Sequence, residues 1–472
     1  MSEEFDGCLE AFDWRYSAAI VGLWRYLEYH ELPFNKDSIQ RDEERDVLRY
    51  RKEDITEERD VLRYRKEDIT EERYLKFAEY FYNEEFPHWK AEKMLKHGNF
   101  NDETVKEINA LLTYNVVLKK IFSKHKFDGE NAEELLTILN ENRLEIIRET
   151  FRNKTNMYRN YCNTNQLFHE PQEVCRLNGY YVDWGKKGKS ASYYRNDKNF
   201  FLGKDISEFD FIPFAFTEYM DGYFINDSSS LLDLVQANER MRQALVQVKQ
   251  ETEAAGKRFT IKQVLFEQLV SSADFLNYDV ELISKQRDND YFETIFLRKK
   301  SIWIFKSLES MKNRNVFNWS FKITEDYYIK VLDEVMDSIV NLKKLDWLIE
   351  FVLKKEEEDK KHYFLLKALI QVNIKIYAFV DGGEKMKQKE IEDCARKIAN
   401  KIEENKLAAY RNKLTSSLVF KDYDRVCQIL LQLSNYSNIS LDCLISTLEN
   451  CEEHKNNVYL FIACLRKQGG EE

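Results

Sequence analysis

The sequence predicts an α+β fold in which a mixed N-terminal domain with short β-sheet elements precedes an all-α C-terminal helical bundle. All four prolines lie in the first half of the chain, and the last of them is Pro213. From about residue 323 onward, apolar residues recur at helical spacing. Residues 279–285 and 291–305 alternate apolar and polar side chains around a QRDND turn, which predicts a β-hairpin.

The length of 472 residues predicts more than one hydrophobic core. We expect a mainly helical part over residues 1–155, an α+β part over 156–320 and the helical bundle over 321–472. Spacing of apolar residues places helices around residues 18–27, 74–86, 102–122, 131–151, 328–339, 365–374, 387–418, 422–433, 441–448 and 456–465.

A perfect tandem repeat interrupts the first part. EERDVLRYRKEDIT occupies residues 43–56 and recurs at 57–70. A solenoid would contain many diverged copies, so two identical copies indicate a recent in-frame duplication or an artefact of the recorded sequence. We predict that DVLRYRKEDI forms a strand, that Thr70 caps the following helix, and that the extra copy is a surface excursion.

Composition is that of a soluble globular protein, with 43% hydrophobic and 33% charged residues and a formal net charge of −11. No apolar run approaches the ~18 residues of a membrane span, and no signal peptide follows Met1. The eight cysteines are scattered without a CxxC pair. We therefore expect a cytoplasmic protein with no membrane partner.

One stretch, residues 178–204, reverses the sign of the charge. Counted from Arg176, it holds seven cations and two acids, or 7 − 2 = +5. Such a local reversal is typical of a contact with a polyanion. Its aromatic residues offer flat surfaces for stacking bases. The alternative is a solvated lysine loop whose aromatic rings belong to the core.

Motifs for catalysis or metal binding do not stand out. GKKGKS at 185–190 resembles the end of a phosphate-binding loop, but Asp183 stands where that loop needs glycine. Cys162, His169 and Cys175 lack the paired spacings of a closed zinc site. We expect a protein that is not an enzyme and needs no cofactor.

Several segments together resemble the large subunit of type I CRISPR Cascade complexes, in its subtype A/B-like branch. In order, they look like that family's aromatic-then-helix start, its loop, strand and "FIN" segments, and a later strand pair. Some branches carry a zinc ribbon in the middle region, whose cysteines this sequence lacks. The segments are FDWRYSAAIVGLWRYLEY (12–29), CRLNGYYVDWGKKGKS (175–190), FDFIPFAF (209–216), YFINDSSSLLDLVQAN (223–238) and FLRKKSIWIFKSL (296–308).

The resemblance implies a non-catalytic subunit of a crRNA-guided surveillance complex. It would recognise the protospacer-adjacent motif in double-stranded DNA, help strand opening and recruit the helicase-nuclease. Its partners would be the other Cascade subunits, crRNA, the target duplex and the displaced strand.

Site residues follow from this reading. Phosphates and bases would be contacted by Lys186, Lys187, Lys189, Ser190, Tyr193, Arg195 and Lys198. Asn226 and Ser228, in a turn after a strand at 223–225, are suited to base edges. Trp184 and Tyr194 would stack or act as a wedge at the opened step. The alternatives are that Asn226 caps a turn and that Trp184 anchors the loop.

The C-terminal bundle would resemble the family's small-subunit-like domain, which lines the path of the displaced strand. Lys389 and Arg396 share a helix face there, and interleaved acidic residues leave a merely solvated face as the alternative. Two other functions remain open. One is a helical-bundle scaffold without nucleic-acid contact, and the other is an enzyme with an unrecognised site.

Overall fold

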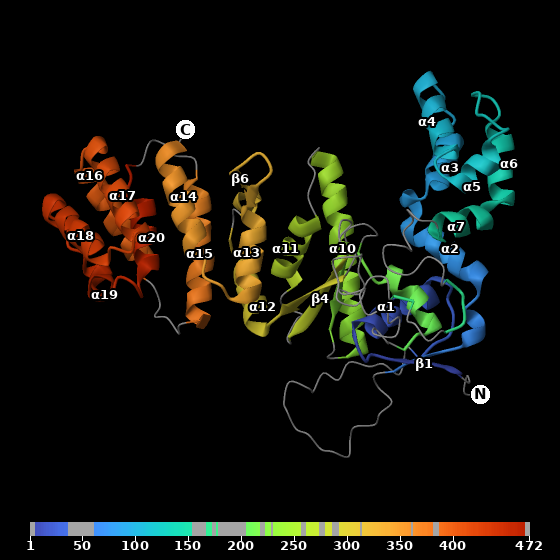
Figure 1. Ribbon diagram of the computed structural model, residues 1–472, viewed down its shortest axis with the longest axis horizontal. Helices are drawn as coiled ribbons and strands as arrows, with labels where there is room; N and C mark the ends of the chain where they lie inside the picture. Colours follow the sequence, from blue (N-terminus) through green and yellow to red (C-terminus); the bar gives the residue numbers. More distant parts are fainter. Residues whose placement is uncertain are drawn as a thin grey trace, which may run out of the picture. The chain divides into compact units, whose positions relative to one another are not determined.

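The computed structural model divides the chain into two compact units, each described here by itself. Unit 1 comprises residues 1–261 and 278–296, and unit 2 comprises residues 262–277 and 297–472. Short antiparallel sheets lie among the helices of unit 1, and helices dominate unit 2, which confirms the α+β class (Figure 1). The structure describes residues 5–35, 61–152, 167–171, 176–177, 204–217, 222–227, 230–255, 261–272, 279–285, 292–311, 314–359, 362–380 and 387–467.

Unit 1 contains the helices and strands of the mixed N-terminal part. They are β1 (Gly7–Glu10), α1 (Trp14–Tyr29), β2 (Val61–Tyr64), η2 (Lys66–Asp68), α2 (Glu71–Tyr82), η3 (Asn83–Glu85), α3 (Pro87–His97), α4 (Asp102–Leu112), α5 (Val116–Phe122), α6 (Ala132–Glu141), α7 (Arg143–Arg152), the 3-10 helix η5 (Ser207–Phe214), β3 (Gly222–Asn226), α10 (Leu231–Ala255), β4 (Val280–Lys285) and β5 (Phe292–Leu297).

Helix α1 is the centre of unit 1. The carboxylate of Asp13 caps it by accepting the backbone N–H groups of Arg15 and Tyr16, and its residues from Ser17 to Leu27 are all buried. Gly22 has no side chain, so the backbone carbonyl of Phe211 in η5 can approach α1 more closely than a Cβ would allow. The helix therefore brings η5 into the core.

The segment FDFIPFAF forms η5 and is not the strand that the resemblance implies. Pro213 has no N–H for a strand ladder, and a 3-10 helix brings residues three apart onto one side. Phe214 consequently meets the rings of Tyr74 and Phe77 at centroid distances of 5.2 and 4.8 Å. This aromatic cluster builds the first core of unit 1, and α3 to α7 enclose a second core.

The second copy of the tandem repeat folds as expected in part: the predicted strand DVLRYRKEDI is limited to Val61–Tyr64, and Lys66–Asp68 form the 3-10 helix η2. Its VLRY segment forms β2, which pairs antiparallel with β1, and the hydroxyl of Thr70 accepts the backbone N–H of Arg73 to cap α2. The first copy lies outside the described residues. On either side of residues 36–60, the side-chain amide of Asn35 donates a hydrogen bond to the backbone carbonyl of Val61 at 2.8 Å.

A second sheet has the strand order β3-β4-β5 and includes the predicted hairpin strands. Asn238 of α10 fastens β3, because its amide both accepts the N–H and donates to the carbonyl of Ile225. The second hairpin strand was predicted to run to residue 305, and this is wrong. The strand ends at Leu297, since the buried residues that follow repeat with helical and not alternating spacing.

Unit 2 contains the predicted bundle, preceded by a short β-hairpin. The expected helix at 387–418 is two helices, because the backbone is extended at Ile402 and Glu403. The elements are α11 (Ile261–Ser272), α12 (Lys299–Ser307), η6 (Arg314–Asn318), β6 (Ser320–Lys322), β7 (Tyr328–Lys330), α13 (Val331–Asn341), α14 (Asp346–Asp359), α15 (Tyr363–Val380), α16 (Gln388–Lys401), α17 (Glu404–Val419), α18 (Tyr423–Ser437), η7 (Asp442–Leu444), α19 (Ile445–Glu449) and α20 (Lys455–Cys464).

Helix α15 is the one described helix that is long and apolar enough to cross a membrane, with half of its 18 residues buried inside the structure. It also carries a buried polar group at its centre. Asn373 accepts the N–H of Leu345 and donates to Asp346 and Asn456 at 2.9 and 2.8 Å. These bonds link α15 to α14 and α20.

Candidate nucleic-acid interface

Most of the predicted basic and aromatic segment lies outside the described residues. Residues 178–203 lie outside the described residues, as do Cys162, Cys175 and the GKKGKS motif. The predicted site residues outside the described part are Trp184, Lys186, Lys187, Lys189, Ser190, Tyr193, Tyr194, Arg195, Lys198 and Ser228. Asn226, Lys389 and Arg396 are described, and so are the residues at both ends of the segment.

The two ends of residues 178–203 meet in a buried ionic cluster. Arg176, just before the segment, donates from its backbone N–H and from Nε to Asp205 Oδ1 at 2.9 and 3.0 Å. Its Nη1 donates to Asp210 Oδ1 at 2.8 Å, and its Nη2 to the carbonyl of His169 at 3.1 Å. The N–H of Phe168 donates to the other oxygen of Asp210 at 3.0 Å. We call Arg176, Asp205 and Asp210 the anchor cluster.

The anchor cluster is removed from water. The side chains of Arg176 and Asp205 are fully buried, and that of Asp210 is nearly so. Burial by itself lowers the pKa of Arg176, but the charges and hydrogen bonds of Asp210 and Asp205 raise this pKa above its ordinary value. The guanidinium therefore stays charged and neutralises two carboxylates inside the protein.

The burial of Arg176 lowers the positive charge that the basic segment can offer to a partner. Arg176 was counted among its seven cations, yet the buried guanidinium cannot reach a phosphate. Without it the stretch to Lys204 holds six cations and two acids, or 6 − 2 = +4. The sequence contained a signal for the anchor, because Asp210 is the one charged residue in the otherwise apolar run FDFIPFAF (209–216), which must be buried. The pairing itself needs the tertiary structure.

Asn226 is the last residue of β3 and not a turn residue. Its Nδ2 donates to Oε2 of Glu281 on the neighbouring strand β4 at 2.9 Å. Its Oδ1 is buried, and no described group bonds to it. The cap of the following helix α10 is Ser230, whose hydroxyl accepts the N–H of Asp233 at 3.0 Å. The bond to Glu281 uses one of the two N–H groups of the Asn226 amide.

The predicted cationic face of α16 is partly neutralised. Arg396 forms ion pairs with Glu392 and Asp393 at 3.1 and 3.9 Å, and a hydrogen bond with Tyr363 is the first cause that raises its pKa. Lys389 and Lys397 are exposed, and neither has an ion pair within the described part of the chain. The face therefore offers two lysines and not a continuous basic stripe.

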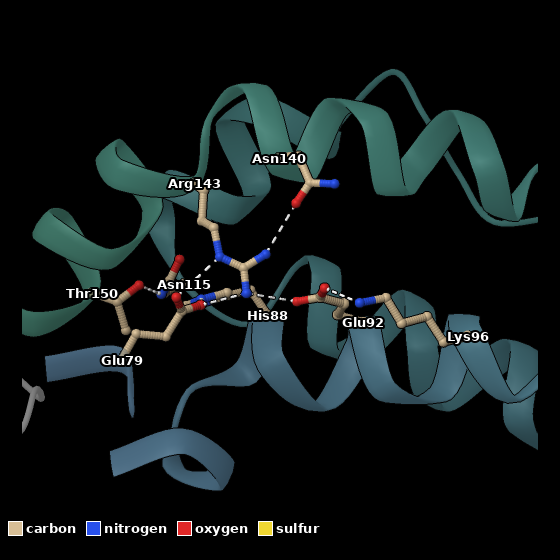
Figure 2. A network of polar contacts seen from close by, with 8 residues as sticks. All are labelled: Glu79, His88, Glu92, Lys96, Asn115, Asn140, Arg143 and Thr150. Atoms are coloured by element: carbon tan, nitrogen blue, oxygen red, sulfur yellow. Dashed lines mark hydrogen bonds and ion pairs between the residues drawn. The ribbon is translucent and has the colours of Figure 1, made fainter. Parts of the chain in front are cut away.

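A second polar cluster joins the two cores of unit 1 (Figure 2). Arg143 of α7 donates to Glu79 of α2 and to Glu92 of α3 at 3.0 and 2.8 Å. The fully buried His88 bonds to Glu79 at 2.8 Å, and Lys96 bonds to Glu92 at 2.6 Å. Each carboxylate is held by two cationic or imidazole partners, so the cluster links helices α2, α3 and α7.

Metal-binding groups are not gathered in the described residues, where no set of three or more His, Cys, Asp or Glu could hold an ion. Among models of known protein families, the one described as CRISPR-associated protein Csx8 matches residues 5–465. Comparisons with curated proteins and with solved structures found no match.

Proposed function

The chain belongs to the family of CRISPR-associated protein Csx8, and from this membership we propose that it is the non-catalytic large subunit of a crRNA-guided type I surveillance complex. In this role it recognises the protospacer-adjacent motif in double-stranded DNA, helps to open the strands and recruits the helicase-nuclease. The family match spans both units, so the proposal concerns the chain as a whole.

The observation that carries the DNA contact is the anchored basic segment. A buried ionic cluster fixes both ends of residues 178–203 on unit 1, and the segment and its flanking Lys204 have a net charge of +4 in a chain of net charge −11. Cations that are not paired with acids inside the protein can neutralise phosphates and release counterions.

Residues around this segment take the roles that the resemblance implies. We assign phosphate contacts to the lysines at 186, 187 and 189 and to Arg195 and Lys198. Trp184 and Tyr194 stack at the opened step, and Ser228 and Asn226 read base edges. Lys389 and Arg396 lie along the displaced strand, where the ion pairs of Arg396 give Lys389 the larger share of the contact.

Affinity purification from cells that express the native operon tests the assembly. The tagged chain should recover several other proteins together with RNA of uniform crRNA length. A chain that purifies alone, free of RNA and partners at low salt, would contradict the proposal.

Motif-dependent duplex binding tests the basic segment. The assembled complex should bind a duplex that carries its motif, and Lys186→Gln, Lys187→Gln and Lys189→Gln together should weaken this binding and flatten its salt dependence. Loss of three phosphate contacts lowers the log–log salt slope by about 2.7. The matched control replaces the exposed Lys106, Lys119 and Lys124 of unit 1 by Gln. Equal salt slopes for the two triple variants would favour a scaffold without nucleic-acid contact.

A further inference from the structure

Helix α12 of unit 2 has one apolar face and one basic face. Ser301, Ile302, Ile304 and Phe305 are buried where the helix packs against α13 and α15. The opposite face carries Lys299, Trp303 and Lys306, which are spaced by four and three residues and lie in one row. Lys300 lies beside this row, and Arg298 precedes the helix; both are exposed.

Trp303 is held in place although 51% of it is exposed. The ring of Phe379 in α15 meets it edge-on, with a centroid distance of 4.9 Å and an interplanar angle of 83°. The ammonium of Lys375, also in α15, lies 5.9 Å from its ring centroid. Large exposed aromatic rings are costly in water, so an indole fixed by neighbours but open to solvent is a ready contact surface.

The segment that holds Trp303 carries charges of one sign. Residues 298–308, RKKSIWIFKSL, contain four cations and no acid, and Lys375 adds a fifth cation from α15. Burial lowers the pKa of Lys375, and no described carboxylate offsets this effect. On α16, in contrast, acids alternate with the cations along the helix. This part of an acidic protein therefore attracts anions.

We propose that the α12 face, formed by Arg298, Lys299, Lys300, Trp303, Lys306 and Lys375, binds single-stranded nucleic acid. The cations neutralise consecutive phosphates, and an unpaired base stacks on the indole of Trp303. A duplex keeps its bases stacked on each other inside the helix, so the exposed ring favours an unpaired strand. This surface adds a second nucleic-acid contact to the proposed function. It rests on the proposed function only in one respect, that the unpaired strand comes from the opened duplex.

Fluorescence anisotropy of the full-length chain with a labelled 30-nucleotide thymidine oligomer tests the α12 face. Trp303→Ala should weaken binding by about five- to a hundredfold and leave the salt slope unchanged, because base stacking involves no counterion. Trp303→Phe should restore most of the affinity. Lys300→Gln with Lys306→Gln should weaken binding and lower the salt slope by about 1.4. Both lysines are exposed, whereas Ser301, Ile302, Ile304 and Phe305 are buried.

The matched controls lie on α14 of the same unit, where Trp347 is 39% exposed and Lys354 is exposed. Trp347→Ala and Lys354→Gln should bind the oligomer as the unaltered chain does. The proposal is overturned if Trp303→Ala binds as tightly as the unaltered chain, or if that chain does not bind the oligomer. It is also overturned if binding depends on the lysines alone, which would indicate a surface for any polyanion, such as an acidic protein.

The experiment separates this proposal from the proposed function. Oligomer binding that depends on Trp303 supports the α12 face even if motif-dependent duplex binding fails. Motif-dependent duplex binding that persists while Trp303→Ala has no effect on the oligomer rejects the α12 face alone.

Discussion

Arg176 stands in a run of cations, yet its contacts are those of a structural residue. Its guanidinium is fully buried between Asp205 and Asp210, while Lys204 at the other end of the segment is exposed. A charge taken out of water must be paired and hydrogen-bonded to be tolerated, and all the bonds described for Arg176 meet this requirement. Two cations of one run therefore have different roles.

Replacing Arg176 should destabilise unit 1 strongly. Arg176→Met leaves two buried carboxylates without their cation, and we expect the free energy of unfolding to fall by about 3–5 kcal/mol. Urea unfolding at neutral pH measures this change. Lys204→Met is the matched control, with an expected change within about 0.5 kcal/mol. Equal stabilities of the two variants would show that the anchor cluster does not stabilise unit 1.

The cluster of Glu79, His88, Glu92 and Arg143 gives unit 1 a dependence on pH. Burial by itself raises the pKa of Glu79, but the hydrogen bonds with His88 and Arg143 outweigh burial, so the pKa lies below its ordinary value. The pKa of Glu92 is lowered in the same way by its hydrogen bonds with Arg143 and Lys96. A carboxylate whose folded-state pKa is lowered stabilises the fold at pH values above its unfolded pKa of about 4.3. This contribution is lost as the pH falls through the folded pKa.

Glu79→Gln tests this dependence. At pH 7 the variant should be less stable by about 1–3 kcal/mol, because a charged hydrogen-bond acceptor is lost. The difference should shrink as the pH falls below the unfolded pKa of about 4.3, because the unfolded chain then binds a proton that the folded carboxylate resists. Urea unfolding at pH 7, 5 and 3.5 measures it, and Glu133→Gln on the exposed side of α6 should change little at any pH. A difference that stays constant with pH would contradict the assignment.

Among the elements, the β1–β2 pair joins strands that lie far apart in the chain. Residues 36–60 lie between Asn35 and Val61, which are hydrogen-bonded to each other. The cost of closing a loop changes slowly with its length, so the number of residues between these two positions hardly affects the pairing.

Deleting one copy of the tandem repeat should therefore be tolerated. Removal of residues 43–56 or of 57–70 gives the same sequence, because the copies are identical. We expect a free energy of unfolding within about 1 kcal/mol of the unaltered chain, since β2 and Thr70 are retained. Thr70→Ala should instead cost about 1 kcal/mol through loss of the α2 cap. A deletion variant that does not fold would show that the repeat is part of the core.

On the scale of the whole molecule, the chain passes between the two units three times, at residues 261–262, 277–278 and 296–297. Each unit has its own internal contacts that a substitution would disturb. In unit 1, Gly22 admits the backbone of η5, and in unit 2, Asn373 links three helices. We expect the units to unfold as separate cooperative transitions.

Differential scanning calorimetry of the full chain tests this expectation. Gly22→Ala places a Cβ against the carbonyl of Phe211 and should lower the Tm of one transition. Asn373→Leu leaves the N–H of Leu345 without its acceptor and should lower the Tm of the other transition. Each kcal/mol lost should shift the affected Tm by roughly 2–4 °C. Both variants shifting one common transition would mean that the units unfold together.

The sequence by itself determined the α+β class, the helical bundle, the cap at Thr70 and the association with CRISPR systems, because periodicity, capping and family-specific segments are local in the chain. It did not determine where the strand at 292–297 gives way to α12, since a short apolar run fits both periods. Only the tertiary structure decided that Arg176 is neutralised by Asp205 and Asp210 and that Lys375 joins Trp303. These pairings depend on which distant segments share one environment, and burial and proximity, not residue type, decide which cations remain available to a partner.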